Sequence, residues 1–116
     1  MDKPLRFLQL SAPRRHLVRL CQSTNYGHLQ DLAIEFHEPI LSPESVVLVD
    51  VRLDSEDTAR RELALGDFVL CREICRLMSV LDQVGNGKIS RLEVRAGIPR
   101  RIILERQVEE LGLVER

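Results

Sequence analysis

An internal repeat with a period of sixty residues constrains the fold of this chain more than any other feature. Residues 27–39 and residues 87–99 align without a gap, and each segment begins with glycine. The aligned apolar and proline positions are Leu29 with Ile89, Leu32 with Leu92, Ile34 with Val94, and Pro39 with Pro99. The repeat indicates that one supersecondary unit is used twice.

Each copy of the repeat has the pattern of a β-hairpin. Apolar residues alternate with polar ones over residues 31–36 and again over residues 91–95, which is typical of half-buried strands. The first return strand is expected over residues 46–53, the most β-prone run in the chain. Two prolines favour a loop or an edge strand over residues 39–45 and not a central strand. The second return strand is expected over about residues 100–106, after a three-residue turn.

A helix is expected before each hairpin. Ser11 followed by Pro13 is a typical helix start, because serine caps the first turn and proline fits it. This first helix should end near residues 23–25. The second helix is expected over about residues 63–84, with Asp67 as the cap of its regular part, and it should end at the glycines that follow.

These elements define an α+β fold of two αββ repeats. Two hairpins of this kind can join into one four-stranded antiparallel sheet with both helices on one face. The whole chain, 1–116, is expected to be a single domain, with αββ units at residues 11–53 and 63–106, a linker at 54–62 and a tail at 107–116. The alternative fold is an all-α EF-hand-like domain.

Composition narrows the cellular setting. With 17 basic and 18 acidic residues, the formal net charge of −1 gives no general attraction to nucleic acid or membrane surfaces. No apolar run approaches the roughly 20 residues of a membrane span, so no membrane association is expected. Three cysteines form no secreted-type pattern, which favours reduced thiols and a cytoplasmic location. Cys71 and Cys75 fall on the apolar face of the second helix, so we expect core residues and no metal or other cofactor.

Residues 82–93 resemble the calcium loop of an EF-hand. Asp82, Asn86 and Glu93 occupy the first, fifth and twelfth positions, where that loop takes oxygen ligands. Val84 at the third position offers no side-chain oxygen, and Pro99 would shorten the exit helix. A degenerate calcium site at these three residues is therefore kept as an alternative.

No catalytic motif occurs in the sequence. It contains no Gly-x-Ser-x-Gly, no phosphate-binding loop and no His-Glu-x-x-His. The paired carboxylates of residues 54–57 lie in the expected linker. The sequence thus favours a protein that is not an enzyme.

The two hairpins carry opposite charge. Residues 28–53 hold five acids and one arginine, a net −4, whereas residues 88–106 hold six bases and two acids, a net +4. Three explanations remain open: favourable pairs between neighbouring strands, contact between hairpins of different copies in a homo-oligomer such as a homodimer, and a nucleic-acid phosphate backbone on the basic hairpin. The binding residues of the basic hairpin would be Arg91, Arg95, Arg100 and Arg101.

The starts of the two hairpins resemble a family of small, uncharacterised bacterial αββ domains. The likeness is carried by Tyr26-Gly27-His28-Leu29 and by Asn86-Gly87-Lys88-Ile89, with a Gly-x-Pro-type turn at Gly97-Ile98-Pro99. The resemblance implies a helix followed by a hairpin in each unit and implies no activity. From all these features we expect a cytoplasmic, non-enzymatic interaction module that self-associates. Nucleic-acid binding and degenerate EF-hand calcium binding are the alternatives.

Overall fold

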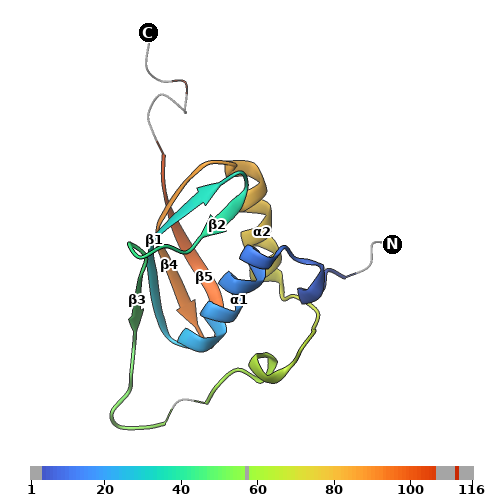
Figure 1. Cartoon of the computed structure of the whole chain (residues 1–116). Coiled ribbons are helices and arrows are strands. Elements are labelled where there is room, and N and C mark those ends of the chain that lie inside the picture. The colour runs from blue at the N-terminus through green and yellow to red at the C-terminus, as the bar shows by residue number, and fades with distance from the viewer. Residues whose placement is uncertain (1–3, 57, 107–111, 113–116) are drawn as a thin grey trace.

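The computed structural model describes residues 4–56, 58–106 and 112. In these residues, two α-helices cover one face of a five-stranded antiparallel sheet (Figure 1). The helices are α1 (Ala12–Thr24) and α2 (Arg72–Val84), and the strands are β1 (Gly27–Glu35), β2 (Glu38–Ile40), β3 (Val46–Val49), β4 (Gly87–Arg95) and β5 (Ile98–Glu105). Two short 3-10 helices are η1 (Phe7–Gln9) and η2 (Arg61–Ala64). The predicted α+β class with an antiparallel sheet is confirmed, and the all-α alternative is wrong.

The sheet is centred on β1 and β4. These strands pair from Gly27 opposite Val94 to Ile34 opposite Gly87. β5 borders β4, while β2 and β3 share the other edge of β1. There β3 pairs with residues 27–30 and β2 with residues 33–35. β3 and β5 are therefore edge strands at opposite sides of the sheet.

The sheet has five strands and not the predicted four, because the first hairpin closes earlier than expected. Phe36 and His37 form a two-residue turn with φ angles of 51° and 67°, which reverses the chain at once. β2 follows within the predicted loop, and Pro39 is tolerated because β2 is an edge strand. Residues 41–45 then leave β1 before β3 returns to it, so the predicted strand over 46–53 is shortened to Val46–Val49. The second turn also has two residues, at 96–97, and not three.

α2 begins at Arg72, nine residues later than the predicted start at residue 63. Residues 65–71 are not helical, because Phe68 packs into the core, where its ring stacks on Phe7 with 4.9 Å between centroids. Asp67 does not cap the helix. Its carboxylate accepts hydrogen bonds from the Leu8 N–H (3.0 Å) and from Arg6 (2.8 Å), and the Arg6 bond holds the pKa of Asp67 below its usual value.

The N-terminus of α1 forms as predicted. The Ser11 hydroxyl accepts a hydrogen bond from the Arg14 N–H at 3.4 Å, and Pro13 lies in the first turn. Serine satisfies an amide that the helix leaves without an intrahelical partner. The helix ends at Asn25, whose φ of 63° turns the chain toward β1.

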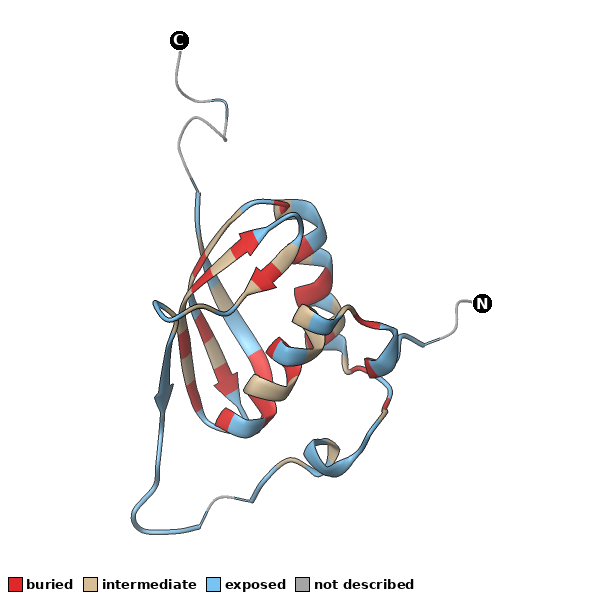
Figure 2. Ribbon diagram, viewed as in Figure 1, coloured by how far each residue is buried: buried red, intermediate tan, exposed pale blue. Residues whose placement is uncertain are grey.

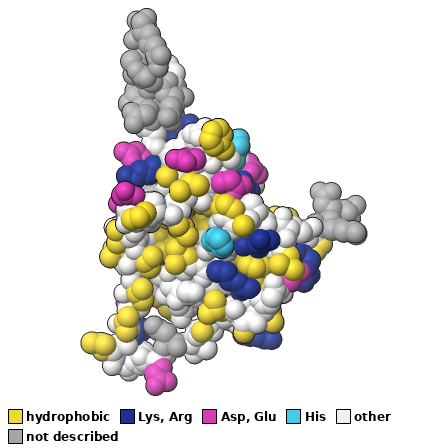
Figure 3. Space-filling model, in the orientation of Figure 1, with side chains coloured by type: hydrophobic (Ala, Val, Ile, Leu, Met, Phe, Trp, Pro, Cys, Tyr) yellow, Lys and Arg dark blue, Asp and Glu magenta, His cyan; other side chains and the backbone are white. Residues whose placement is uncertain are grey.

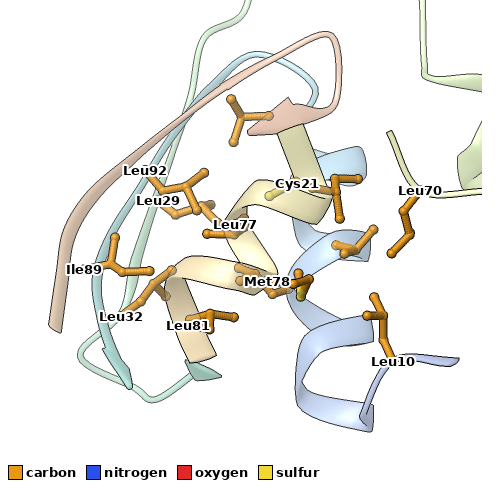
Figure 4. Close-up of a cluster of buried hydrophobic side chains, with 14 of the residues drawn as sticks. Leu10, Cys21, Leu29, Leu32, Leu70, Leu77, Met78, Leu81, Ile89 and Leu92 are labelled. Carbon is orange, nitrogen blue, oxygen red and sulfur yellow. The ribbon is translucent and has the colours of Figure 1, made fainter. Parts of the chain in front are cut away.

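The core lies between the helices and the covered face of the sheet (Figure 2). Leu29 and Leu92 of the two central strands point toward Leu77 of α2, and Met78 and Cys21 connect the two helices (Figure 4). These side chains are almost fully buried, and their burial is the main force that holds the layers together. Neither α1 nor α2 has the length and apolar character needed to cross a membrane.

Candidate interaction surfaces

The edge strand β3 exposes an unbroken aliphatic run. Val46, Val47, Leu48 and Val49 are each between 41% and 56% exposed, and the downstream Leu53 is 97% exposed. The whole strand is drawn as exposed in Figure 2, and hydrophobic side chains cover much of the face that Figure 3 shows. Among the described residues, only β1 pairs with β3. β3 thus presents both apolar side chains and one free row of backbone donors and acceptors.

Gly27 holds β3 against β1 at close range. A Cβ atom at residue 27 would lie 2.0 Å from the carbonyl oxygen of Leu48, and the backbone there has a φ of 156°. Because of this contact and this φ angle, a residue other than glycine would fit at position 27 only if the chain moved. At the end of β3, the Asp50 N–H donates to the carbonyl oxygen of Tyr26 at 2.7 Å. The exposed strand is therefore a fixed part of the sheet and not a loose loop.

A second surface is the groove between α2 and β5, with a volume of about 500 Å³. Its apolar floor includes Leu77, Val80 and Ile102. Four arginines and one glutamate border it, namely Arg72, Arg76, Arg100, Arg101 and Glu73. This combination suits a ligand that has both aliphatic and acidic groups.

The arginines of the groove differ in their pairing. Arg100 binds Glu73, with 3.1 Å between Nη1 and Oε2, and Arg72 lies 3.8 Å from the same carboxylate group. Neither Arg76 nor Arg101 makes a hydrogen bond or ion pair within the described part of the chain. Two guanidinium groups therefore remain available to an external carboxylate.

The structure divides the four arginines predicted to bind ligands between two faces. Arg91 and Arg95 alternate with buried residues of β4, so they lie on the sheet face away from the helices. Arg101 pairs across the strands with Glu93 on that same outer face, and because β5 is an edge strand Arg101 also lines the groove beside α2. Arg100 is the extra residue of a bulge in β5, and it points to Glu73 of α2.

The outer-face arginines surround one carboxylate. Glu93 lies 3.0 Å from Arg95 and 4.0 Å from the Nε2 atom of His28. Three of the four predicted binding residues thus share a surface, but Glu93 neutralises part of its charge. Sequence reasoning assigned the four arginines to one hairpin and missed their division between two faces.

The residues of the calcium alternative do not converge. Asp82 in α2 accepts a hydrogen bond from Arg14, and the side-chain oxygen of Asn86 accepts one from the Phe36 N–H. Glu93 lies seven residues further along an extended strand, about 20 Å away by strand geometry. Where the EF-hand requires an exit helix, the chain forms β4. The described residues contain no group of three or more His, Cys, Asp or Glu side chains that could hold a metal ion.

The three cysteines are free thiols in different settings. Cys21 is buried in α1, and burial raises the pKa of its thiol to about 12. Cys75 is partly exposed, and its pKa is raised first by burial and then by the neighbouring Cys71. Raised pKa values reduce the thiolate population, so neither residue has the environment of a reactive nucleophile.

Opposite charges also meet within the sheet. Lys88 of β4 lies 3.1 Å from the carboxylate of Asp31 in β1 and 3.8 Å from that of Glu105 in β5. The hydrogen bond that Lys88 donates to the Asp31 carboxylate is the main cause that raises the pKa of Lys88. These cross-strand pairs involve exposed groups, and neither of them includes an arginine of the α2–β5 groove.

Sequence reasoning missed both surfaces. The sequence predicts a return strand over 46–53 and nothing about its exposure, although the unbroken apolar character of residues 46–49 was a signal of an unusual strand. Arg72 and Arg76 are spaced by about one helical turn, which places them on one side of α2. Their proximity to β5 is set by the tertiary structure.

No protein-family model, curated protein or solved structure matches this chain.

Proposed function

We propose that this protein is a non-enzymatic interaction module that self-associates through the outer edge of β3. The observation that carries this proposal is the run Val46–Val49, four consecutive exposed aliphatic residues on an edge strand. Such a strand can accept or supply a further strand, because its free backbone groups gain hydrogen bonds while its side chains lose contact with water.

The arrangement of helices and strands along the chain also supports the proposal. We infer that it consists of two αββ units related by a local two-fold axis. α1 and β1 begin at residues 12 and 27, and α2 and β4 begin sixty residues later, at 72 and 87. The register between the central strands is symmetric in the same way, because Gly27 faces Val94 and Gly87 faces Ile34. The resemblance to small bacterial αββ domains is consistent with this proposal.

The proposed setting is the cytoplasm. Cys21, Cys71 and Cys75 are all free, and reduced thiols are typical of that compartment. The proposed activity requires no cofactor, because strand addition uses only backbone groups and side chains.

Sedimentation equilibrium over micromolar to hundred-micromolar concentrations tests self-association. The wild-type protein is expected to form species larger than the monomer, and Leu48→Lys is expected to shift them toward monomer because it places a charge on the free edge. Leu8→Lys is the matched control, since Leu8 is also an exposed leucine but lies in η1. A wild-type protein that stays monomeric at every concentration would refute the proposal.

Nucleic-acid binding is the second candidate function. The observation that favours it is the shared outer face of Arg91, Arg95 and Arg101. Binding through these residues would weaken steeply with salt, because bound arginines release counterions from the phosphates. A gel shift with DNA and RNA at low salt tests it, with Arg91→Gln as the variant that should lose binding. No shift for the wild-type protein removes this candidate.

A further inference from the structure

We propose that β3 of one copy binds beside β5 of a second copy, in the groove between α2 and β5, so that copies join head to tail. This inference rests on the proposed self-association and specifies its second surface. It is supported by the size of the groove, by its charge and by the directions of the strands.

The groove and the aliphatic run have matching lengths. The four residues Val46–Val49 span about 13 Å as a strand. The groove follows α2 from Arg72 to Val80, and eight helical residues span about 12 Å. The aliphatic side chains that face the helix layer would cover the half-buried Val80 and Ile102 of the apolar floor.

Charge favours this pairing over contact between identical edges. Glu44 and Asp50 flank the aliphatic run, so two β3 strands side by side would bring four carboxylates together. Two β5 strands would likewise bring arginines together. A contact of β3 with the groove instead places the carboxylates beside Arg76 and Arg101, which have no partner among the described residues. Opposite charges across a strand pair stabilise it, and like charges destabilise it.

Strand direction allows the contact without turning either molecule over. β3 and β4 both run antiparallel to β1, and β5 runs antiparallel to β4. β3 and β5 therefore have opposite directions within one copy. A second copy shifted across the sheet, with its helices on the same side, presents β3 antiparallel to β5 of the first copy.

The corresponding groove beside α1 lacks these features. It has a volume of about 260 Å³ and is lined by Ala12, Pro13, His16, Pro39, Ile40 and Leu41. It contains no arginine, so it offers no charged partner for Glu44 or Asp50. The head-to-tail contact uses two different surfaces, and such contacts produce chains or rings of copies unless one surface is blocked.

Two charge-reversal variants test the pairing. The groove variant is Arg76→Glu/Arg101→Glu, and the strand variant is Glu44→Lys/Asp50→Lys. Each is expected to self-associate at least about tenfold more weakly than wild type, because the charges on one side of the proposed interface are reversed. Arg91→Glu is the matched control, because it reverses an exposed arginine on the outer face and should associate as wild type does. Far-UV circular dichroism verifies that every variant is folded.

The decisive measurement is an equimolar mixture of the two variants. The groove variant keeps an intact strand and the strand variant keeps an intact groove, and the two reversed surfaces also carry opposite charges. The mixture should therefore regain association, which light scattering detects as species larger than the monomer. One chain that carries all four substitutions should regain self-association.

The contrary outcomes separate this inference from the proposed function. A groove variant that associates as strongly as wild type would overturn the groove as acceptor and leave association through β3 intact. A mixture that stays monomeric, together with a monomeric four-substitution chain, would also overturn it. A monomeric wild-type protein would instead refute the proposed self-association itself.

Discussion

The backbone N–H of His37 donates a hydrogen bond to the carbonyl oxygen of Gly85, with 2.7 Å between the two atoms. A matching bond of 2.8 Å joins the N–H of Gly97 to the carbonyl oxygen of Asn25. Each hairpin turn is therefore attached to the residue that ends the helix of the other half. Both capping residues have left-handed backbone angles, with φ of 71° at Gly85 and 63° at Asn25.

Replacement of Gly85 by alanine should destabilise the fold. An added Cβ atom would lie 3.2 Å from the His37 ring, and the φ of 71° is unfavourable for alanine. We expect a loss of about 1–2 kcal/mol in the free energy of unfolding, measured by urea denaturation. Gly66→Ala is the control, because its Cβ would meet nothing within 4 Å and its φ is not positive. Equal stabilities of the two variants would contradict the role of this cap.

Gly27→Ala should displace β3 from the sheet. Its Cβ would collide with the backbone at Leu48, whereas the Cβ of Gly87→Ala would meet mainly a side-chain methyl group of Val84, at 3.1 Å. We expect Gly27→Ala to cost at least about 2 kcal/mol and Gly87→Ala clearly less. Amide hydrogen exchange should show loss of protection over residues 46–49 in the first variant alone. Preserved protection there would mean that close approach at residue 27 is not required.

The buried thiol of Cys21 should make stability depend on alkaline pH. Its folded pKa of about 12 lies above the usual value of 9.0, so above pH 9 the unfolded chain loses this proton first. The stabilising effect is complete below pH 9 and decreases as the pH rises toward 12, by up to about 1.4 kcal/mol per pH unit. Denaturation at several pH values should show this slope in wild type and a shallower slope in Cys21→Ala. Parallel slopes would contradict the assignment.

Arg19 should hold the segment before α2 against α1. Its guanidinium donates hydrogen bonds to the carbonyl oxygens of Glu62, Leu63 and Leu65 and lies 4.3 Å from the centre of the Phe7 ring. Arg19→Met keeps the aliphatic stem and removes these bonds, at an expected cost of about 1–3 kcal/mol.

Limited proteolysis measures the release of this segment. Arg19→Met should be cleaved within residues 58–66 faster than wild type. Arg15→Met is the control, since the only hydrogen bond from the Arg15 side chain among the described residues reaches Leu10. Equal cleavage rates in both variants would show that Arg19 does not restrain the segment.

Sequence patterns predicted the elements whose causes are local. The alternation along β1 and β4, the serine cap of α1 and the residues that end both helices each depend on a few neighbouring residues. The predicted start of α2 was wrong because Phe68 is held by Phe7, a contact between residues about sixty positions apart. Periodicity within one segment contains no information about such a partner.

For the candidate surfaces too, some features follow from the local sequence and others from contacts between distant parts of the chain. The sequence alone determined an α+β chain with an antiparallel sheet and with an acidic and a basic segment, because residue order sets both alternation and local charge. Only the tertiary structure decided that β3 lies uncovered at one edge, that Arg100 and Arg101 point to different sides of β5, and that α2 forms a groove with that strand. Exposure and grooves arise where separate elements meet or fail to meet, and packing of the whole chain determines where that happens.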